Sequence, residues 1–212
     1  MQMRELINKI NIYNAKIIFY DKTDLVDKPN EGLPIYFTPV EGKELKKYRN
    51  IKGKKDFIST TASIHIPDLS IEEFVDIFEC DCTGLYDFTN NIIKPYCNKG
   101  IDNKIVFTIF VFLHEVGHWN QFEKMERNVS TFESRDCELS EENSNKMTTL
   151  IEKRSERIKK GNTCVLTSKE KELFIQYMIE YRNIPKEKEA DEFALNQIES
   201  VLKIYLDYSN SI

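Results

Sequence analysis

Histidine and cysteine are scarce in this sequence, and a long apolar run is missing. The five cysteines are an odd number without the paired spacing of a disulfide framework, which indicates a reducing compartment. Residues 1–16 are too polar for a signal peptide, and the most apolar stretch, residues 105–113, is too short to span a bilayer. These absences argue against a secreted disulfide scaffold and predict a cytoplasmic protein without membrane association.

No charge of one sign dominates the chain either. Its net charge of −5 gives no general attraction to nucleic acid or anionic membranes, and no DNA-binding motif is evident. A hydrophobic content of 41% with 31% charged residues is typical of a soluble globular protein. The 212 residues are enough for a real core, and no periodic repeat or low-complexity tract divides them. We therefore expect a single domain, residues 1–212.

Two of the three histidines lie close together, in the stretch IVFTIFVFLHEVGHWNQF at residues 105–122. In a helix, His114 and His118 project from one face, one turn apart. Two imidazoles at this spacing can hold one Zn²⁺ ion, with Glu115 beside the open metal position. There Glu115 can take a proton from water and pass it to a leaving amine. The motif predicts a zinc site with Glu115 as the catalytic group.

The residues before the motif predict a buried helix. Residues 105–113 include one polar side chain, Thr108, so the helix is apolar on all sides. Gly117 weakens a helix interior by about 1 kcal/mol relative to alanine. We expect it to allow close approach of a neighbouring backbone or of a substrate.

A catalytic zinc ion needs a third protein ligand, and no third histidine follows the motif. The segment PKEKEADEFA, residues 185–194, begins with a proline suited to the first turn of a helix. Glu187 and Asp191 share one face of that helix. Glu187 is the predicted third ligand, and Asp191 is the predicted acceptor for the far nitrogen of a ligand histidine. Glu123 and Glu126 are rival ligands, although a straight helix points Glu123 away from the metal.

HEVGH followed by EKEAD resembles the HExxH and ExxAD pattern of gluzincin-type zinc metallopeptidases, in style most like the ImmA/IrrE-like family of bacteria and phages. The HtpX-like membrane peptidases share both motifs but carry transmembrane helices, for which this sequence has no candidate. The resemblance implies that His114, His118 and Glu187 bind zinc. It also implies that Glu115 is the catalytic glutamate and that Asp191 contacts one of the ligand histidines. It also implies cleavage of one cognate protein. Glu187 follows His118 by 69 positions, a longer gap than is usual in the family.

Residues 1–66 are predicted to form the sheet. Residues 17–20, 33–40 and 57–66 are β-branched or aromatic runs bounded by turn-forming residues. We expect the last strand, SIHIP, to be an edge beside the active-site helix that can pair with an extended substrate. His65 on this strand is either a structural histidine or a cleft residue that polarises the scissile carbonyl. Residues 43–55 hold seven basic side chains, which form a solvated loop or a docking patch for an acidic partner.

Residues 67–122 are predicted to form two short helices and then the motif helix. Ser70 and Glu73 form a capping box for the first, and residues 85–96 form the second. Cys80, Cys82 and Cys97 fit no common zinc spacing and are expected to be ordinary thiols.

Residues 123–166 are a polar insertion, expected to be a surface helix, a lid or a partner-binding arm. Residues 167–212 return to helices, the first of which is capped by Thr167 and Glu170. Tyr181 and Arg182 precede the predicted third ligand. They either stabilise the oxyanion of the transition state or serve core packing and a salt bridge.

Together these patterns predict an α+β, zincin-like fold that is mainly helical, with a small N-terminal mixed sheet and a buried active-site helix. The predicted function is a zinc-dependent endopeptidase for a protein or peptide substrate, with no nucleic-acid or membrane partner. One alternative is a metal-binding interaction module without turnover. The other is an accidental HEVGH motif without metal, disfavoured because unpaired polar groups in so apolar a helix are costly to bury.

Overall fold

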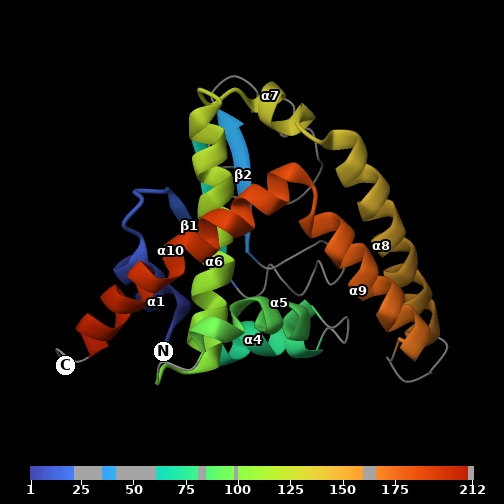
Figure 1. Cartoon of the computed structure of the whole chain (residues 1–212), viewed down its shortest axis with the longest axis horizontal. Helices are drawn as coiled ribbons and strands as arrows, with labels where there is room; N and C mark the ends of the chain where they lie inside the picture. The colour runs from blue at the N-terminus through green and yellow to red at the C-terminus, as the bar shows by residue number, and fades with distance from the viewer. Residues whose placement is uncertain (22–34, 42–60, 81–84, 98–99, 160–165, 210–212) are drawn as a thin grey trace.

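The computed structural model describes residues 1–21, 35–41, 61–80, 85–97, 100–159 and 166–209. Helices dominate this part of the chain, and three short strands form a mixed sheet, in agreement with the expected α+β class (Figure 1). The elements are α1 Met3–Ile10, β1 Ile17–Tyr20, β2 Tyr36–Glu41, β3 Thr61–Pro67, α4 Ile71–Cys80, α5 Leu85–Ile93, the 3₁₀ turn η2 Lys94–Tyr96, α6 Asn103–Lys124, α7 Val129–Ser134, α8 Cys137–Lys159, α9 Ser168–Arg182 and α10 Pro185–Ser209.

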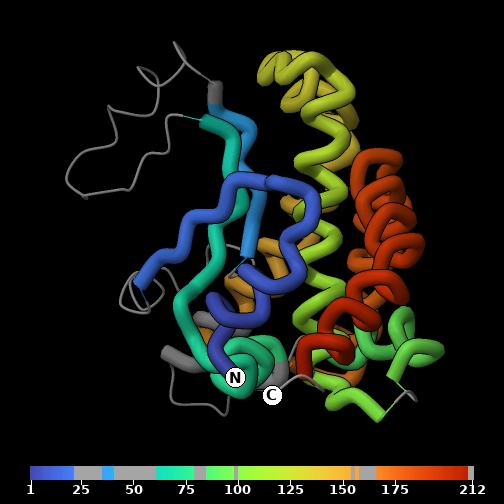
Figure 2. Tube along the Cα trace, turned by 90° about the vertical axis from the view of Figure 1, so that its left-hand side faces the viewer, coloured from blue at the N-terminus to red at the C-terminus, as the bar shows by residue number. Residues whose placement is uncertain are grey.

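Helix α6 is the central element, with the sheet on one side and α10 on the other (Figure 2). Its N-cap residue is Asp102, whose side chain accepts a hydrogen bond from the Lys104 N–H at 2.8 Å. Every residue from Val106 to His118 is buried. The Thr108 hydroxyl donates to the Lys104 carbonyl at 2.8 Å, which satisfies it inside the helix. The prediction of a helix buried on all sides is confirmed.

The order of the sheet corrects one expectation. Strand β3 is central, because it pairs with β1 in parallel and with β2 in antiparallel fashion. It was expected at the edge, yet its residues from Ala62 to Pro67 are all buried, as suits a strand covered on both faces. In the described sheet the edge strand next to α6 is β2. The predicted strand residues 33–34 and 57–60, and the basic stretch 43–55, lie outside the described residues.

An N-terminal helix interrupts the region that was predicted to form only sheet. Helix α1 buries Met3, Leu6, Ile7 and Ile10, a helical spacing that is visible in the sequence. The helix packs against α10. The expectation for residues 1–16 was therefore incomplete, while the strand predicted at residues 17–20 is confirmed.

The predicted helices after the sheet are present. Ser70 and Glu73 form the capping box ahead of α4, with the Glu73 N–H donating to the Ser70 hydroxyl at 3.2 Å and the Ser70 N–H donating to Glu73 at 3.0 Å. The capping box of Thr167 and Glu170 begins α9. None of the helices in the described part of the chain is long and apolar enough to cross a bilayer.

Gly117 permits the close crossing of α6 and α10. A Cβ atom added at Gly117 would lie 2.8 Å from the Cα of Ala190 and 3.1 Å from its Cβ. No side chain larger than hydrogen fits there without movement of α10. The expectation that Gly117 allows a neighbouring backbone to approach is confirmed, and the crossing places the first turn of α10 beside the two histidines.

Candidate metal centre

Three buried side chains converge where α10 begins to cross α6. His114 and His118 project from one face of α6, and Glu187 projects from the first turn of α10. The His114 Nε2 atom lies 3.1 Å from the Nε2 atom of His118, and the Glu187 Oε2 atom lies 3.3 Å and 3.4 Å from these two nitrogens. Among the described residues, this is the group of potential ligands that could hold a metal ion.

The three distances fit a tetrahedral ion. Zinc binds imidazole nitrogen and carboxylate oxygen at about 2.0–2.2 Å, which separates the ligand atoms of a tetrahedral site by about 3.3–3.5 Å. The observed separations lie at or slightly below this range. The group therefore matches a site with three protein ligands and a fourth position open to water or substrate.

Each imidazole is oriented through its other nitrogen. The His114 Nδ1 atom lies 2.8 Å from the Asp191 Oδ1 atom, the contact predicted from the sequence. The His118 Nδ1 atom lies 3.1 Å from the Gln121 Oε1 atom. Gln121 donates from Nε2 to the carbonyl of Lys186 at 2.7 Å, so its Oε1 atom is the acceptor that faces His118. Both rings then carry their proton on Nδ1 and present a bare Nε2 lone pair.

With both rings neutral, three acceptors face one another without a donor between them, so either a proton on one ring or a metal cation must separate them. The Glu187 Oε2 atom is buried and makes no hydrogen bond within the described structure. Burial and the Arg182 charge work against protonation of His114, yet Asp191 and Glu187 outweigh them and raise the pKa of His114 to about 9. Burial alone would raise the pKa of Glu187, but the two imidazoles hold it well below its usual range. The site is built to attract positive charge, which a divalent cation supplies.

Glu115 lies beside this group and faces the edge of the sheet. Its carboxylate is buried and accepts a hydrogen bond from the Phe37 N–H of β2. Burial raises the pKa of Glu115, and the nearby imidazoles and the Phe37 hydrogen bond oppose the rise only in part. A raised pKa makes the carboxylate a stronger base, as a group that accepts a proton from water must be.

Tyr181 and Arg182, the last residues of α9, also reach the centre. The Tyr181 hydroxyl donates to the Glu187 carboxylate, and burial holds its pKa well above the usual value. Arg182 donates from Nη1 to the Asp191 Oδ1 atom at 2.7 Å, and the same nitrogen lies 3.0 Å from the His114 Nδ1 atom. In the described structure both side chains contact the ligands or their partner, and Arg182 forms the salt bridge considered as one of its two roles.

His65 has partners that are separate from the metal group. Its ring stacks on Tyr36, with centroids 4.8 Å apart, and its Nε2 atom lies 3.2 Å from the Ser63 hydroxyl. Burial and the Lys16 charge lower the pKa of His65 to about 4, so the ring is neutral near pH 7. Such contacts are expected of a structural histidine, which is one of the two roles considered from the sequence.

Among the described residues, the rival ligands and Cys97 do not belong to the metal group. Glu123 pairs with Arg127 at 2.7 Å, and Glu126 is exposed just after α6 ends. Cys97 is half-buried and lies 3.5 Å from the Ile93 carbonyl, while Cys82 falls outside the described residues.

The polar insertion holds the first turn of α10, a role that its sequence did not reveal. The Asp136 Oδ2 atom accepts a hydrogen bond from the Lys186 N–H at 3.0 Å, and Arg135 forms a two-pronged ion pair with Glu189. Asp136 adopts a left-handed backbone conformation with φ of 57°. The segment between α7 and α8 therefore fixes the turn that carries Glu187. Only the packing of α10 brings these residues together, since they lie about fifty positions apart in the chain.

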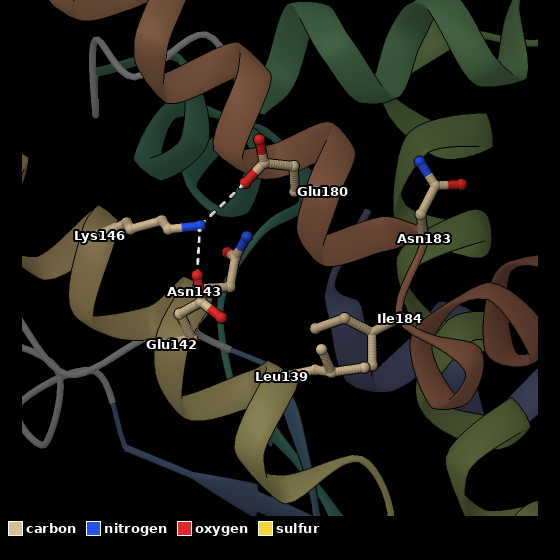
Figure 3. Close-up of a pocket in the computed structure, with 7 residues that line it drawn as sticks. All are labelled: Leu139, Glu142, Asn143, Lys146, Glu180, Asn183 and Ile184. Atoms are coloured by element: carbon tan, nitrogen blue, oxygen red, sulfur yellow. Dashed lines mark hydrogen bonds and ion pairs between the residues drawn. The ribbon is translucent and has the colours of Figure 1, made fainter.

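Helix α8 docks along α9 around a hollow of 170 Å³ (Figure 3). Lys146 of α8 links the two helices by contacting Glu180 of α9 at 3.4 Å, and it also contacts Glu142 of its own helix at 2.9 Å. The buried Asn143 donates to the Tyr177 carbonyl at 3.1 Å. The insertion is thus tied to α9 as well as to α10.

Comparison of the chain with protein-family models, with curated proteins and with solved structures finds no match. The resemblance to the ImmA/IrrE-like peptidases accordingly rests on the two sequence motifs alone.

Proposed function

We propose that this chain is a zinc-dependent endopeptidase of zincin-like architecture, related in its motifs to the ImmA/IrrE-like family. The observation that carries the proposal is the convergence of the bare lone pairs of His114, His118 and Glu187 beside the buried Glu115. Binding of a metal does not need a buried general base next to the open coordination position, whereas amide hydrolysis does.

The residues present fit zinc in number, donor type and separation, with His114, His118 and Glu187 as its ligands. A zinc ion bound there supplies Lewis acidity and lowers the pKa of water towards about 7. Glu115 takes the proton of the attacking water on a carboxylate oxygen and passes it to the amine that leaves. Asp191 and Gln121 keep the two rings in the tautomer that this chemistry requires.

The substrate backbone is proposed to lie along β2. This strand is the edge of the described sheet next to α6, and its Phe37 N–H already reaches Glu115. An extended peptide that adds to this edge presents its amide groups beside the proposed base. The sequence had predicted that β3 would be the edge strand that binds substrate, and we now propose this function for β2. Cleavage of one specific cytoplasmic partner remains part of the proposal.

The test uses zinc-loaded protein and a mixture of peptides whose cleavage is followed by mass spectrometry. We expect new termini with the wild type and none with Glu115→Gln, because the amide cannot accept the proton of water. Both proteins must hold equal zinc for the comparison to be valid. Equal cleavage by zinc-loaded Glu115→Gln would remove Glu115 from its role, and no cleavage by either protein would favour the second candidate.

That second candidate is a metal-binding interaction module without turnover. Exposed apolar side chains on α8 and α9, Leu139 and Ile179, are the observation that favours it. In that case the zinc site stabilises the fold, and Glu115 takes part in no reaction.

A further inference from the structure

A pocket of 370 Å³ lies on the flank of α6 that faces away from the candidate metal centre. Val116 and Asn120 line it, and each follows a metal-facing histidine by two residues. Two residues correspond to a rotation of about 200° round a helix, so the pocket and the histidines lie on opposite flanks. The pocket is therefore a separate site.

Aromatic side chains from three segments wall this pocket. Tyr13 precedes β1, Trp119 lies on α6 and Phe193 lies on α10. The rings of Tyr13 and Phe193 meet edge to face with centroids 5.5 Å apart, and the Tyr13 hydroxyl donates to Gln197 at 3.1 Å. The ring of Phe37 packs against Trp119 in an edge-on arrangement, with centroids 6.1 Å apart. The walls are fixed before any ligand arrives.

One carboxylate and one guanidinium stand at the rim. Glu123 pairs with Arg127 at 2.7 Å, and the guanidinium carbon of Arg127 lies 5.8 Å from the centroid of the Trp119 ring. Cation–π attraction extends to about 6 Å, so Arg127 occupies the outer limit of this interaction. Its side chain is 48% exposed. The chain already places a cation of its own against Trp119 and Glu123, while the interior of the pocket stays open.

We propose that this pocket binds an organic cation, an alkylammonium or guanidinium group, between the aromatic walls and the Glu123 carboxylate. The ring faces attract the cation through their quadrupoles, and Glu123 neutralises it. The incoming group replaces the rim contact of Arg127, which swings into solvent. The source of the cation is either a free quaternary ammonium compound or a lysine side chain of a protein.

Trp119 reports directly on the pocket because it is the only tryptophan of the chain. Its fluorescence is titrated with tetramethylammonium, with N-acetyl-lysine amide and with tert-butanol, an uncharged molecule of similar shape. We expect a saturable change with at least one of the two cations and none with tert-butanol. The cation that binds more tightly identifies the source. The signal does not depend on peptidase activity, so its failure and the failure of the proposed function are distinguishable.

Two substitutions at the rim should act in opposite directions. Glu123→Gln removes the counter-charge and should weaken cation binding by about fivefold, whereas Arg127→Gln removes the internal competitor and should strengthen it by a similar factor. Glu72→Gln, an exposed acid on α4, is the matched control and should change nothing. Far-ultraviolet circular dichroism checks that each variant is folded.

Three results would overturn the proposal. The first is no saturable change with either cation, and the second is an equal change with tert-butanol, which would show an apolar site. The third is weaker binding in folded Arg127→Gln and Glu123→Gln alike, because competition between Arg127 and the ligand cannot produce it.

Discussion

The Nε2 atoms of His114 and His118 face each other at 3.1 Å although neither ring can donate from that nitrogen while its proton remains on Nδ1. With Glu187 as a third acceptor, the arrangement is unfavourable as a buried set of lone pairs and favourable round a cation. This relationship makes the metal the most direct quantity to measure.

We expect the purified protein to bind one zinc ion per chain, as elemental analysis can determine. His114→Ala and Glu187→Ala should each lose most of it, because two ligands rarely hold zinc against buffer. Glu126→Ala, an exposed acid that was a rival ligand, is the control and should keep full occupancy. Zinc retained by Glu187→Ala would place the third ligand elsewhere.

Gln121 should matter to zinc although it cannot reach the ion. Gln121→Ala removes the acceptor that orients the His118 ring, and such outer partners typically contribute 10–100-fold, so we expect zinc affinity to fall by about tenfold or more. Competition with a chromophoric chelator measures this. Asn120→Ala changes the adjacent residue on the other flank of α6 and should leave the affinity intact. Equal affinities in wild type and Gln121→Ala would show that His118 needs no orientation.

Much of the site follows from local spacing, and the rest depends on how distant segments pack. His114, Glu115 and His118 share one turn of one helix, and Glu187 with Asp191 shares another, so helical periodicity was sufficient to group them. Gln121 lies three residues after His118, a spacing that a search for ring partners on the same helix face would have found. Its amide orientation, however, is set by the Lys186 carbonyl of α10.

The order of the strands was beyond local pattern. Ser63 and His65 stand at alternate positions of β3, and polar residues in that pattern suggest a face exposed to solvent, although both are buried here. From the sequence alone, the strand could therefore not be placed in the centre of the sheet. Here the buried Ser63 and His65 side chains lie within hydrogen-bond distance of each other, and the His65 ring also stacks on Tyr36. The hydrogen bond from the Lys186 N–H to Asp136 could not be predicted either, because it depends on the path of the insertion and on the left-handed backbone conformation of Asp136, which no sequence pattern indicated.

The hydrogen bond between Asp136 and the first turn of α10 can be tested by measuring stability and zinc affinity together. Asp136→Ala removes an acceptor for the first turn of α10 and should lower the free energy of unfolding by about 1 kcal/mol, as for the loss of a helix cap. It should also lower zinc affinity, because Glu187 sits in the turn that is released. Asp87→Ala on α5 is the control. A loss of stability with unchanged zinc affinity would confine Asp136 to a structural role.

Gly117→Ala tests the crossing of the two helices. In an open helix the substitution would stabilise the protein by about 1 kcal/mol, whereas here the new methyl group collides with the Ala190 backbone. We expect a net destabilisation of about 1–3 kcal/mol, typical of overpacking, measured by urea unfolding. Zinc affinity should fall as well, since α10 carries Glu187 away from the histidines. A stabilised variant would contradict the close approach.

His65 should make the protein less stable as the pH falls. The pKa of His65 is about 4 in the folded protein and 6.5 when unperturbed. Between pH 4 and 6.5, the ring is therefore protonated in the unfolded chain and neutral in the folded chain. The free energy of unfolding should therefore decrease as the pH drops from 6.5 towards 4, by at most about 1.4 kcal/mol per pH unit from this residue. His65→Gln removes this contribution. As the pH falls from 6.5 towards 4, the variant should therefore lose less unfolding free energy than the wild type. Urea titrations of both proteins at several pH values give this difference directly. A difference that stays constant with pH would mean that folding does not lower the pKa of His65, because the ring would then take up its proton equally in the folded and unfolded states.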